Sequence, residues 1–274
     1  MLTDLHSHST RSDGRVSPDE LVSLAVQNSV ARLAMTDHDL VFFAEYEPSF
    51  SLMLEIISGT ELSCTWAKQT IHVLGLNMHY DKREAIEQHC SALSEGREKR
   101  ALIIADKLEK LGMLGAYNGA LEQAEGGQIG RPHFARWMVN AGYVKDMSAA
   151  FKKYLGQGKV GDVKSEWPHI SEAVAAIRAS GGTPVLAHPK QYRMTNTKMR
   201  ALITDFKSMG GQGLEVSNGY QPADQVAYLT TLANQFGLAI SAGSDFHGPA
   251  TPYHRPGGFT PLPENGTPIW ELWN

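Results

Sequence analysis

The chain contains several short apolar segments of the kind that form buried strands, and almost every one of them ends at a side chain that can bind a metal ion. One histidine at the end of a strand is more often a hydrogen-bonded structural residue than a ligand. Six apolar segments that each end in His, Asp or Glu are hard to explain in that way. Because groups that follow parallel strands meet at one edge of a barrel, the pattern predicts an α/β fold with a single metal site at that edge. The candidate ligands, in chain order, are His6, His8, Asp13, His38, Glu61, His72, His188, Asp245 and His247.

The opening of the chain holds the strongest single motif. His6 and His8 end a short strand, and residues i and i+2 of a strand point to the same side, so both imidazoles can reach one cation. Such a pair alone also fits two surface histidines or the remnant of a tag. Asp13 follows in a turn rich in Ser, Asp and Gly, where an anionic oxygen suits a second cation beside the first.

The donor set indicates which metals fit. Imidazole and carboxylate together suit zinc, manganese or iron, and a set without cysteine is unlike a closed structural zinc site. Nine donors exceed what one tetrahedral ion can use, so we expect two or three divalent ions, drawn from manganese, zinc, iron and magnesium. Neighbouring cations polarise a phosphoryl oxygen, lower the pKa of a bridging water and stabilise the charge of an in-line displacement. The donor set therefore indicates a site for metal-dependent hydrolysis.

Helical patterns alternate with the apolar segments. Ser17, Pro18 and Glu20 form a capping sequence for a helix that runs to about Asn28. Three more helices each precede a strand, which predicts a mainly parallel sheet: 171–180, 197–209 and 222–236.

The middle of the chain differs from both ends. Residues 82–125 and 131–154 have helical spacing and no strand signal. We therefore predict a barrel in two parts, residues 1–80 and 166–274, with a helical cap subdomain inserted at residues 81–165 over the barrel mouth.

Composition limits the classes of function. The 274 residues can bury the core of one barrel-sized domain, and 25 basic against 29 acidic residues exclude a high-pI protein that coats nucleic acid in bulk. Two cysteines without a CxxC pair, Cys64 and Cys90, fit a reducing compartment. With no signal peptide and no apolar run long enough to span a membrane, a cytoplasmic location is the default expectation.

The ordered motifs resemble those of the polymerase and histidinol phosphatase (PHP) family of phosphoesterases, over residues 4–247. The resemblance rests on these segments: Asp4-Leu-His-Ser-His8, Ser12-Asp13-Gly14, Thr36-Asp37-His38-Asp39, Gly59-Thr-Glu61, His72-Val-Leu-Gly75, Ala187-His188-Pro189 and Gly243-Ser-Asp245-Phe-His247. It implies a distorted (β/α)7 TIM-like barrel with a trinuclear site. The implied ligand sets are His6, His8, Glu61 and Asp245 for one ion; Glu61, His72 and His188 for a second, with Glu61 as a bridge; and Asp13, His38 and His247 for a third.

Other segments resemble one branch of that family, the bacterial 3',5'-nucleoside bisphosphate phosphatases, which includes 5'-to-3' exoribonucleases. These segments are Gly130–Arg136, Phe151–Lys159 and Trp66. The resemblance implies a nucleotide or short RNA substrate, with no membrane and no obligatory protein partner. The candidate substrate contacts are Arg131, His133, Lys153, Lys159 and Lys190. Arg131 and His133 could hold a phosphate by paired hydrogen bonds and a helix N-terminus, whereas charged helical residues otherwise mostly face solvent.

Two departures from the branch concern substrate contacts. Lys190-Gln191-Tyr192 follows His188-Pro189 where the branch more often has Gly-Arg-Tyr, and the interval from His38 to Glu61 is short. Two alternatives stay open. One is a phosphatase for a small metabolite such as histidinol phosphate, which needs no phosphate site in the cap. The other is a non-catalytic binding module with a PHP fold, which would be expected to have lost ligands. Glu215 and Asp37 are candidates for carboxylates that orient the ligand histidines.

Overall fold

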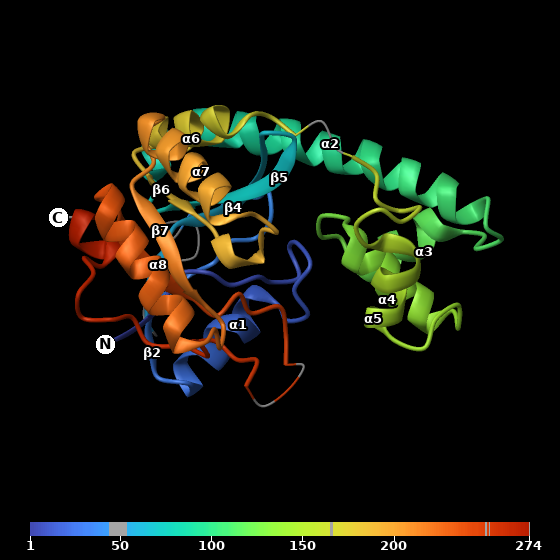
Figure 1. Ribbon diagram of the computed structural model, residues 1–274. Coiled ribbons are helices and arrows are strands. Elements are labelled where there is room, and N and C mark those ends of the chain that lie inside the picture. Colours follow the sequence, from blue (N-terminus) through green and yellow to red (C-terminus); the bar gives the residue numbers. More distant parts are fainter. Residues whose placement is uncertain (44–53, 165–166, 250, 252, 274) are drawn as a thin grey trace.

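The computed structural model describes residues 1–43, 54–164, 167–249, 251 and 253–273. It consists of a body, which holds the described strands, and a helical insertion at one side (Figure 1). No helix in this described part of the chain is long and apolar enough to cross a membrane. Much of the short interval between His38 and Glu61, residues 44–53, lies outside the described residues.

The first sheet of the body is parallel and carries the first candidate ligands. Its strands lie in the order β1 (Leu2–Asp4), β2 (Val30–Ala34) and β3 (Glu55–Ile57). Helix α1 (Pro18–Gln27) connects β1 to β2, and the Ser17 hydroxyl accepts a hydrogen bond from the Glu20 N–H at 3.2 Å. The predicted N-terminal cap is therefore confirmed.

The second sheet has five strands and is mixed. Its order is β4 (Gly59–Trp66), β5 (Gln69–Leu76), β6 (Thr183–Leu186), β7 (Gly213–Asn218) and β8 (Ala239–Gly243). The pairs β6–β7 and β7–β8 are parallel, whereas β4–β5 and β5–β6 are antiparallel.

A tight hairpin explains the antiparallel strands. Ala67 and Lys68 alone join β4 to β5, and both have positive φ, 46° and 64°. A two-residue loop with positive φ at both positions matches the twist of an antiparallel pair and leaves no room for a crossover helix. The βα alternation is interrupted here, so the barrel arrangement of the predicted distorted (β/α)7 TIM-like fold is not confirmed. The fold is mixed α/β with two sheets, and among the described residues no ladder joins β3 to the second sheet.

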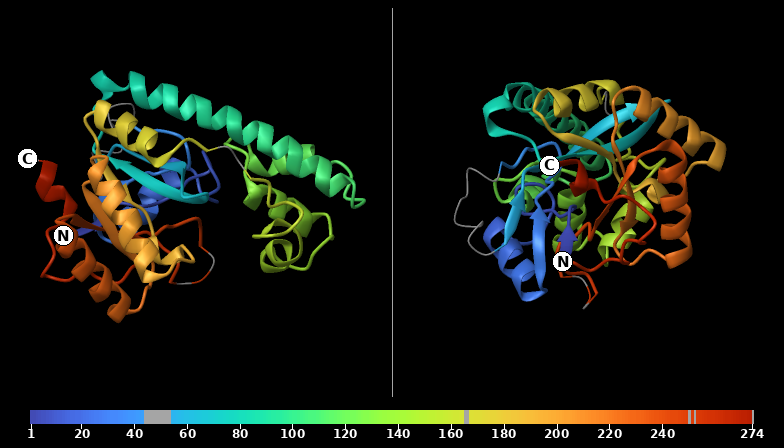
Figure 2. Two further views of the ribbon diagram at one scale, coloured as in Figure 1. Left: turned by 45° about the horizontal axis from the view of Figure 1, so that its top comes forward. Right: turned by 90° about the vertical axis from the view of Figure 1, so that its left-hand side faces the viewer.

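The two sheets meet where β1 lies beside β8. The Leu5 N–H donates to the Ala242 carbonyl at 3.1 Å, and just beyond β1 the Asp245 N–H donates to the His6 carbonyl at 2.8 Å. The parallel strands therefore end at a common edge, and the loops after β1, β2, β6 and β8 share one end of the body. This edge faces the helical insertion (Figures 1 and 2).

Three helices pack against the second sheet and form the main core with it: α6 (Ile170–Ala179), α7 (Asn196–Ser208) and α8 (Ala223–Phe236). Their bounds agree with the three predicted helices to within one residue. Trp66 is buried in this core, and its indole N–H donates to Asp205 Oδ2 at 2.8 Å. The Trp66 ring is therefore part of the core.

The insertion is built on one long helix. Helix α2 (Glu84–Glu109) places Ile86 and Leu93 in the core of the body, and Ile104 and Leu108 in a second core. The second core also draws on α3 (Ala116–Ala124), α4 (Arg131–Asn140), α5 (Met147–Ala150) and the π-helical turn Phe151–Leu155. The described residues of 81–165 contain no strand, as predicted, and Cys64 and Cys90 are free and buried.

One ion pair joins the middle of α2 to the loop after β2. The Arg97 Nε donates to Asp39 Oδ2 at 2.6 Å, and its Nη2 donates to the Ser63 hydroxyl at 3.0 Å. Asp39 is fully buried, and its other oxygen accepts the Ser63 N–H at 2.5 Å. The pair therefore connects the insertion to a loop that begins one residue after His38.

We predict that Arg97→Ala lowers the free energy of unfolding by about 3–5 kcal/mol, because it leaves the Asp39 carboxylate buried without its partner. Lys99→Ala is the matched control. Lys99 lies on the same helix with a side chain 76% exposed, and its pair with Glu95 should contribute less than about 1 kcal/mol. Urea unfolding of the two variants measures the difference. Equal stabilities would mean that the Arg97 pair does not hold the two parts together.

Candidate metal centre

All nine predicted ligands lie together at the edge of the body that faces the insertion. They come from separate elements: His6 and His8 after β1, Asp13 in the following turn, His38 after β2, Glu61 in β4, His72 in β5, His188 after β6, and Asp245 and His247 after β8. Contacts between imidazole and carboxylate atoms, 2.7 to 4.0 Å long, connect all of them into one cluster.

Glu61 is the centre of this cluster. Its Oε1 lies 2.7 Å from His188 Nε2 and 2.9 Å from His72 Nδ1. Its Oε2 lies 2.9 Å from His38 Nδ1 and 3.4 Å from the Nε2 atoms of both His6 and His8. One buried carboxylate therefore faces five imidazoles, with its two oxygens divided between two groups of them.

The spacing around Glu61 Oε2 fits a shared cation. Two donors that bind one ion tetrahedrally at about 2.1 Å lie about 3.4 Å apart. The Nε2 atoms of His6 and His8 lie 3.4 Å from Glu61 Oε2, and 3.5 and 3.4 Å from Asp245 Oδ1. These distances are long for hydrogen bonds, and they match donors that converge on a common point.

A second group lies on the other side of His8. Asp13 Oδ1 is 3.2 Å from His247 Nε2 and 4.0 Å from His8 Nδ1, and Asp13 Oδ2 is 3.8 Å from His38 Nε2. The rings of His8 and His247 stack with centroids 4.0 Å apart. These four residues can offer donor atoms close enough together for one ion.

Several buried donor atoms of the cluster lack hydrogen bonds within the described chain. They are His6 Nε2, both ring nitrogens of His8, Asp13 Oδ1, His38 Nδ1 and His188 Nδ1. Leaving a buried polar atom without a partner costs about 1–3 kcal/mol, so a group of them at one place needs a ligand. Divalent cations fit these donors, because neutral imidazole and carboxylate are their common ligands.

The carboxylates of the cluster stay ionised. Burial by itself would raise the pKa of Glu61, but His38, His72 and His6 outweigh burial and hold the pKa well below its usual range. Asp245, beside His6, also has a pKa well below its usual range in spite of burial. The cluster is therefore anionic at its centre at any pH at which the protein would work.

The histidines are shifted in both directions. Burial, together with the charge of His247, lowers the pKa of His8 to about 4. Removal from solvent also acts to lower the pKa of His247, but the Asp13 carboxylate outweighs it and raises that pKa to about 10. Without bound cations, protons on some imidazoles balance the carboxylates.

Two further carboxylates support the cluster from behind. Glu215 Oε1 lies 2.9 Å from His6 Nδ1, and its Oε2 accepts the His188 N–H at 2.6 Å, so Glu215 orients a candidate ligand as predicted. Asp37 acts differently, because its carboxylate forms no hydrogen bond with a histidine among the described residues. It accepts hydrogen bonds from the Ser9 N–H, the Ser9 hydroxyl and the Ser12 hydroxyl at 2.8, 2.7 and 2.6 Å, and so holds the turn that carries Asp13.

The unusual segment after His188 also contacts the cluster. The Gln191 amide donates to Asp245 Oδ2 at 3.2 Å, and the Tyr192 hydroxyl accepts the His72 N–H at 2.8 Å. In the sequence these residues are only a departure from the branch, and nothing there predicts their contact with the candidate ligands. Their role depends on contacts 54 and 120 residues away along the chain, which no spacing rule reveals.

The backbone is strained at two candidate ligands. His188 and Asp245 have positive φ, 26° and 52°, a backbone conformation that residues other than glycine rarely adopt. Such strain costs about 1–3 kcal/mol per residue and persists where the surroundings determine the conformation. The hydrogen bonds from the His188 N–H to Glu215 and from the Asp245 N–H to the His6 carbonyl supply that constraint.

Of the two predicted substrate contacts at the start of α4, Arg131 is more accessible than His133. It opens α4, its side chain is 33% exposed, and its guanidinium lies 3.2 Å from the Leu155 carbonyl and 3.8 Å from Asp162. His133 is 1% exposed, and its Nδ1 accepts the Gly130 N–H at 2.9 Å. Burial, aided by the charge of Arg136, lowers the pKa of His133 to about 4, so this side chain is neutral.

The predicted lysine contacts are dispersed. Lys153 and Lys159 are exposed on the insertion. Lys190 is exposed on the body, and its ammonium lies 4.6 Å from the centroid of the Tyr228 ring in α8. Lys190 therefore lies on a different part of the molecule from Lys153 and Lys159.

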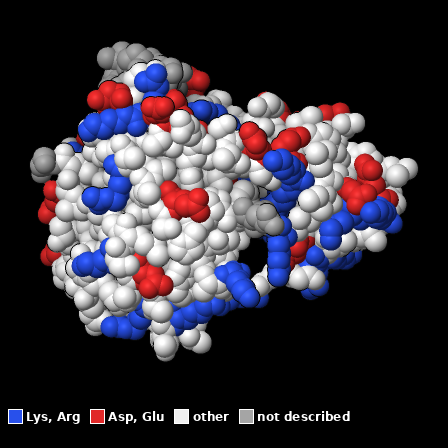
Figure 3. All heavy atoms as spheres, turned by 90° about the horizontal axis from the view of Figure 1, so that it is seen from above, with Lys and Arg blue, Asp and Glu red and all other residues white. Residues whose placement is uncertain are grey.

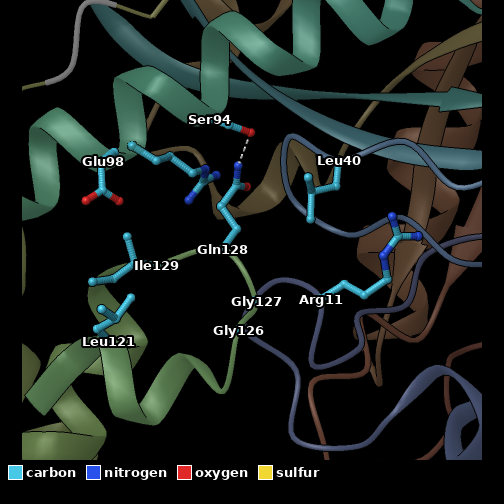
Figure 4. Close-up of a pocket in the computed structure, with 10 residues that line it drawn as sticks. Arg11, Leu40, Ser94, Glu98, Leu121, Gly126, Gly127, Gln128 and Ile129 are labelled. Carbon is cyan, nitrogen blue, oxygen red and sulfur yellow. Dashed lines mark hydrogen bonds between the residues drawn. The ribbon is translucent and has the colours of Figure 1, made fainter. Parts of the chain in front are cut away.

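A cavity of about 430 Å³ lies at the junction of body and insertion (Figure 4). Its walls include Arg97 of α2, Gln128 and Ile129 ahead of α4, and Arg11 and Leu40 from the loops of the body. Arg11 and Leu40 each lie two residues from a candidate ligand, Asp13 and His38. None of the nine candidate ligands lines the cavity, which has the size of a small-molecule site.

Comparison with known families matches the PHP domain to residues 4–161. The chain belongs to the PHP family. The resemblance inferred from the sequence is therefore confirmed.

Curated relatives share nearly the full length. The chain is 43% identical to a 5'-3' exoribonuclease of Haemophilus influenzae, over 98% of this chain and 97% of the relative. It is 38% identical to a 3',5'-nucleoside bisphosphate phosphatase of Chromobacterium violaceum, over 97% of this chain and 94% of the relative.

Solved structures agree with the fold. A Chromobacterium violaceum protein described as an amidohydrolase, solved with bound sulfate and no metal, superposes with a TM-score of 0.91 at 37% identity, covering 99% of this chain and 95% of that one. A Bifidobacterium adolescentis protein described as a metal-dependent phosphoesterase superposes with a TM-score of 0.80 at 27% identity, covering 98% of this chain and 93% of that one.

We predict that metal binding at neutral pH releases protons. Below its pKa of about 10, His247 is protonated in the metal-free protein, whereas an imidazole must be neutral to bind a metal. Calorimetric titration with manganese in two buffers of different ionisation enthalpy measures the release. His247→Gln should release about one proton fewer per chain, and His254→Gln, at an exposed histidine outside the cluster, should match the wild type. The same release from His247→Gln and wild type would show that His247 does not exchange its proton for a metal.

Proposed function

We propose that this protein is a metal-dependent phosphoesterase that hydrolyses 3',5'-nucleoside bisphosphates and removes nucleotides from the 5' end of short RNA. The observation that carries the proposal is the convergence of nine donor side chains into one cluster centred on Glu61, in which several buried donor atoms lack hydrogen bonds within the described chain. Support for the substrate class comes from relatives named 5'-3' exoribonuclease and 3',5'-nucleoside bisphosphate phosphatase, which match over nearly the whole chain.

In this proposal the cluster holds three divalent ions, of manganese, zinc, iron or magnesium. His6, His8, Glu61 and Asp245 would hold one, Glu61, His72 and His188 a second, and Asp13, His38 and His247 the third. Bound there, the ions would polarise the phosphoryl group, activate water and stabilise the charge that develops on the phosphate oxygens. The chain itself orients the donors, with Glu215 on His6 and Asp37 on the turn of Asp13.

We also assign residues 1–80 and 166–274 to a distorted barrel that is left open beside β3, and residues 81–165 to a cap that recognises the substrate. The Arg131 guanidinium offers a site for a phosphate that is not cleaved, with His133, Lys153, Lys159 and Lys190 as further candidates. The cavity at the junction would then receive the nucleoside between the two phosphates. Its apolar side chains, Leu40, Leu121 and Ile129, suit a base.

The first test is hydrolysis by the wild-type protein in the presence of manganese. Adenosine 3',5'-bisphosphate should release inorganic phosphate, and 5'-phosphorylated RNA should release mononucleotides from its 5' end. His8→Ala should abolish both reactions and keep the circular dichroism spectrum, because loss of a donor for the ions does not empty the hydrophobic core. Full activity in His8→Ala would refute the site, and activity on histidinol phosphate alone would favour a small-metabolite phosphatase.

A second prediction concerns the bridge. Since the two oxygens of Glu61 face different groups of histidines, Glu61→Gln should weaken two ion sites, whereas His38→Ala should weaken one. Elemental analysis after dialysis against trace manganese should find less metal per chain in Glu61→Gln than in His38→Ala. The same metal content in both variants would contradict the proposed bridge.

A third prediction concerns the second phosphate. Arg131→Ala should reduce kcat/KM for adenosine 3',5'-bisphosphate by the value of a charge-assisted contact, about 1.5–3 kcal/mol. It should hardly change hydrolysis of p-nitrophenyl phosphate, which has no second phosphate. Lys145→Ala removes an exposed charge of the same insertion and should change neither. If Arg131→Ala leaves the ratio of the two specificity constants unchanged, the insertion does not recognise phosphate at this residue.

A further inference from the structure

Two large aromatic side chains stand exposed beside the metal cluster. Tyr220 is 54% exposed and Tyr253 is 68% exposed, and their ring centroids lie 5.9 Å apart at an interplanar angle of 82°. Tyr220 follows β7 and Tyr253 lies in the segment after β8. Burial of aromatic rings is favourable, so two rings held together in solvent mark a surface that can receive a ligand.

The backbone on both sides of Tyr220 is held by hydrogen bonds. The Thr260 N–H donates to the Gly219 carbonyl at 3.1 Å, and the Gly219 N–H donates to the Gly243 carbonyl at 3.0 Å. The Thr260 hydroxyl donates to the Gln221 carbonyl at 2.5 Å. Tyr220 is therefore presented on a loop that is tied on both sides of the residue.

The tyrosine pair is continuous with the candidate metal centre. Asn218, two residues before Tyr220, donates to Asp245 Oδ2 at 3.2 Å. Two residues span at most about 7 Å between Cα atoms, so the loop of Tyr220 begins next to a candidate metal ligand. Figure 1 shows the segment after β8 on the side of the body that faces the insertion.

Basic side chains accompany the rings. Arg255 lies two residues after Tyr253, and Arg15 packs against Gly248 in the segment after His247. Both are exposed, and no carboxylate pairs with either among the described residues. Arg15 also lines one hollow together with Arg136 and Glu125 of the insertion. Figure 3, from a different side, shows Lys and Arg on both sides of the indentation between body and insertion.

We propose that Tyr220 and Tyr253 form a stacking platform for the bases of single-stranded RNA downstream of the cleaved bond, with the nearby arginines on its phosphates. This inference rests on the proposed function. If the insertion holds the 5' phosphate and the metal cluster holds the bond to be cleaved, the rest of the RNA must leave over the body, where the tyrosines lie. Exposed aromatic rings flanked by cationic groups are what single-stranded nucleic acid requires, because every base has a face that can stack.

The platform predicts a difference between substrates of different length. A 3',5'-bisphosphate has no downstream nucleotide, whereas a 5'-phosphorylated tetranucleotide does. The double variant Tyr220→Ala and Tyr253→Ala should lower the ratio of kcat/KM for the tetranucleotide to kcat/KM for the bisphosphate by about 5-fold or more, the effect of losing one stacked base. The matched control, Tyr220→Phe with Tyr253→Phe, keeps both rings and should keep the ratio of the wild type.

Other outcomes would overturn the platform. An unchanged ratio in the alanine variant would show that the rings do not contact RNA. Equal losses in the alanine and phenylalanine variants would show that the hydroxyl groups act, not stacking. If the alanine variant keeps the ratio of specificity constants but differs from the wild type in molecular mass by light scattering, the tyrosines contact a second copy of the protein and not RNA.

A binding measurement separates this inference from the proposed function. The metal-free wild-type protein is titrated into 5'-phosphorylated RNA that carries 2-aminopurine at its second position, and stacking should quench the fluorescence of that base. The alanine variant should quench it less than the phenylalanine variant. If the wild type hydrolyses neither substrate but quenches in this ring-dependent way, the hydrolytic function fails and the platform stands. If it hydrolyses both substrates without ring-dependent quenching, the platform fails alone.

Discussion

The organisation of the body depends on one buried carboxylate, Glu61. Five imidazoles from four separate segments of the chain converge on its two oxygens. An anion removed from water is tolerated only where charges or hydrogen bonds compensate it, so the strands that deliver these histidines must meet at one place. Positive φ at His188 and Asp245 is part of the cost of that convergence. Because the donors must lose protons to bind cations, metal affinity, folding stability and pH are coupled in this protein.

Helix α2 contributes residues to two hydrophobic cores and connects them as one continuous helix. Its first half packs in the body and its second half in the insertion, and Arg97 binds Asp39 at the point between them. A continuous helix is stiff, and a buried ion pair adds a directional contact that packing alone lacks. The position of the insertion is therefore mechanically linked to the loop of His38. In the proposed function this link keeps the phosphate-binding residues of the insertion at a set distance from the metal cluster.

The two sides of the metal cluster offer different chemistry to a substrate. In the proposed function the insertion presents the Arg131 guanidinium, which would recognise a phosphate by charge and geometry. The body presents Tyr220 and Tyr253, which in the proposed platform would recognise any base by its face. Such an arrangement would give strict selection of the 5' end together with tolerance of sequence beyond it. Those are the properties that processive trimming of mixed RNA sequences requires.

The candidate donors could be selected from the sequence because their signals are local. His6 and His8 share one side of an extended segment, Asp13 lies in a Ser/Asp/Gly turn, and each other donor lies in or closely follows a strand. The capped helix at Ser17 was equally local. The sequence does not predict the hairpin at Ala67 and Lys68, because neither residue is the Gly, Asn or Asp that usually forms a turn with positive φ. The interruption of the barrel by this hairpin was therefore not predicted either. Contacts between distant segments depend on how the elements pack, which no spacing encodes. The pairing of Arg97 with Asp39 across 58 residues, and the meeting of Tyr220 with Tyr253, were decided only by the tertiary structure.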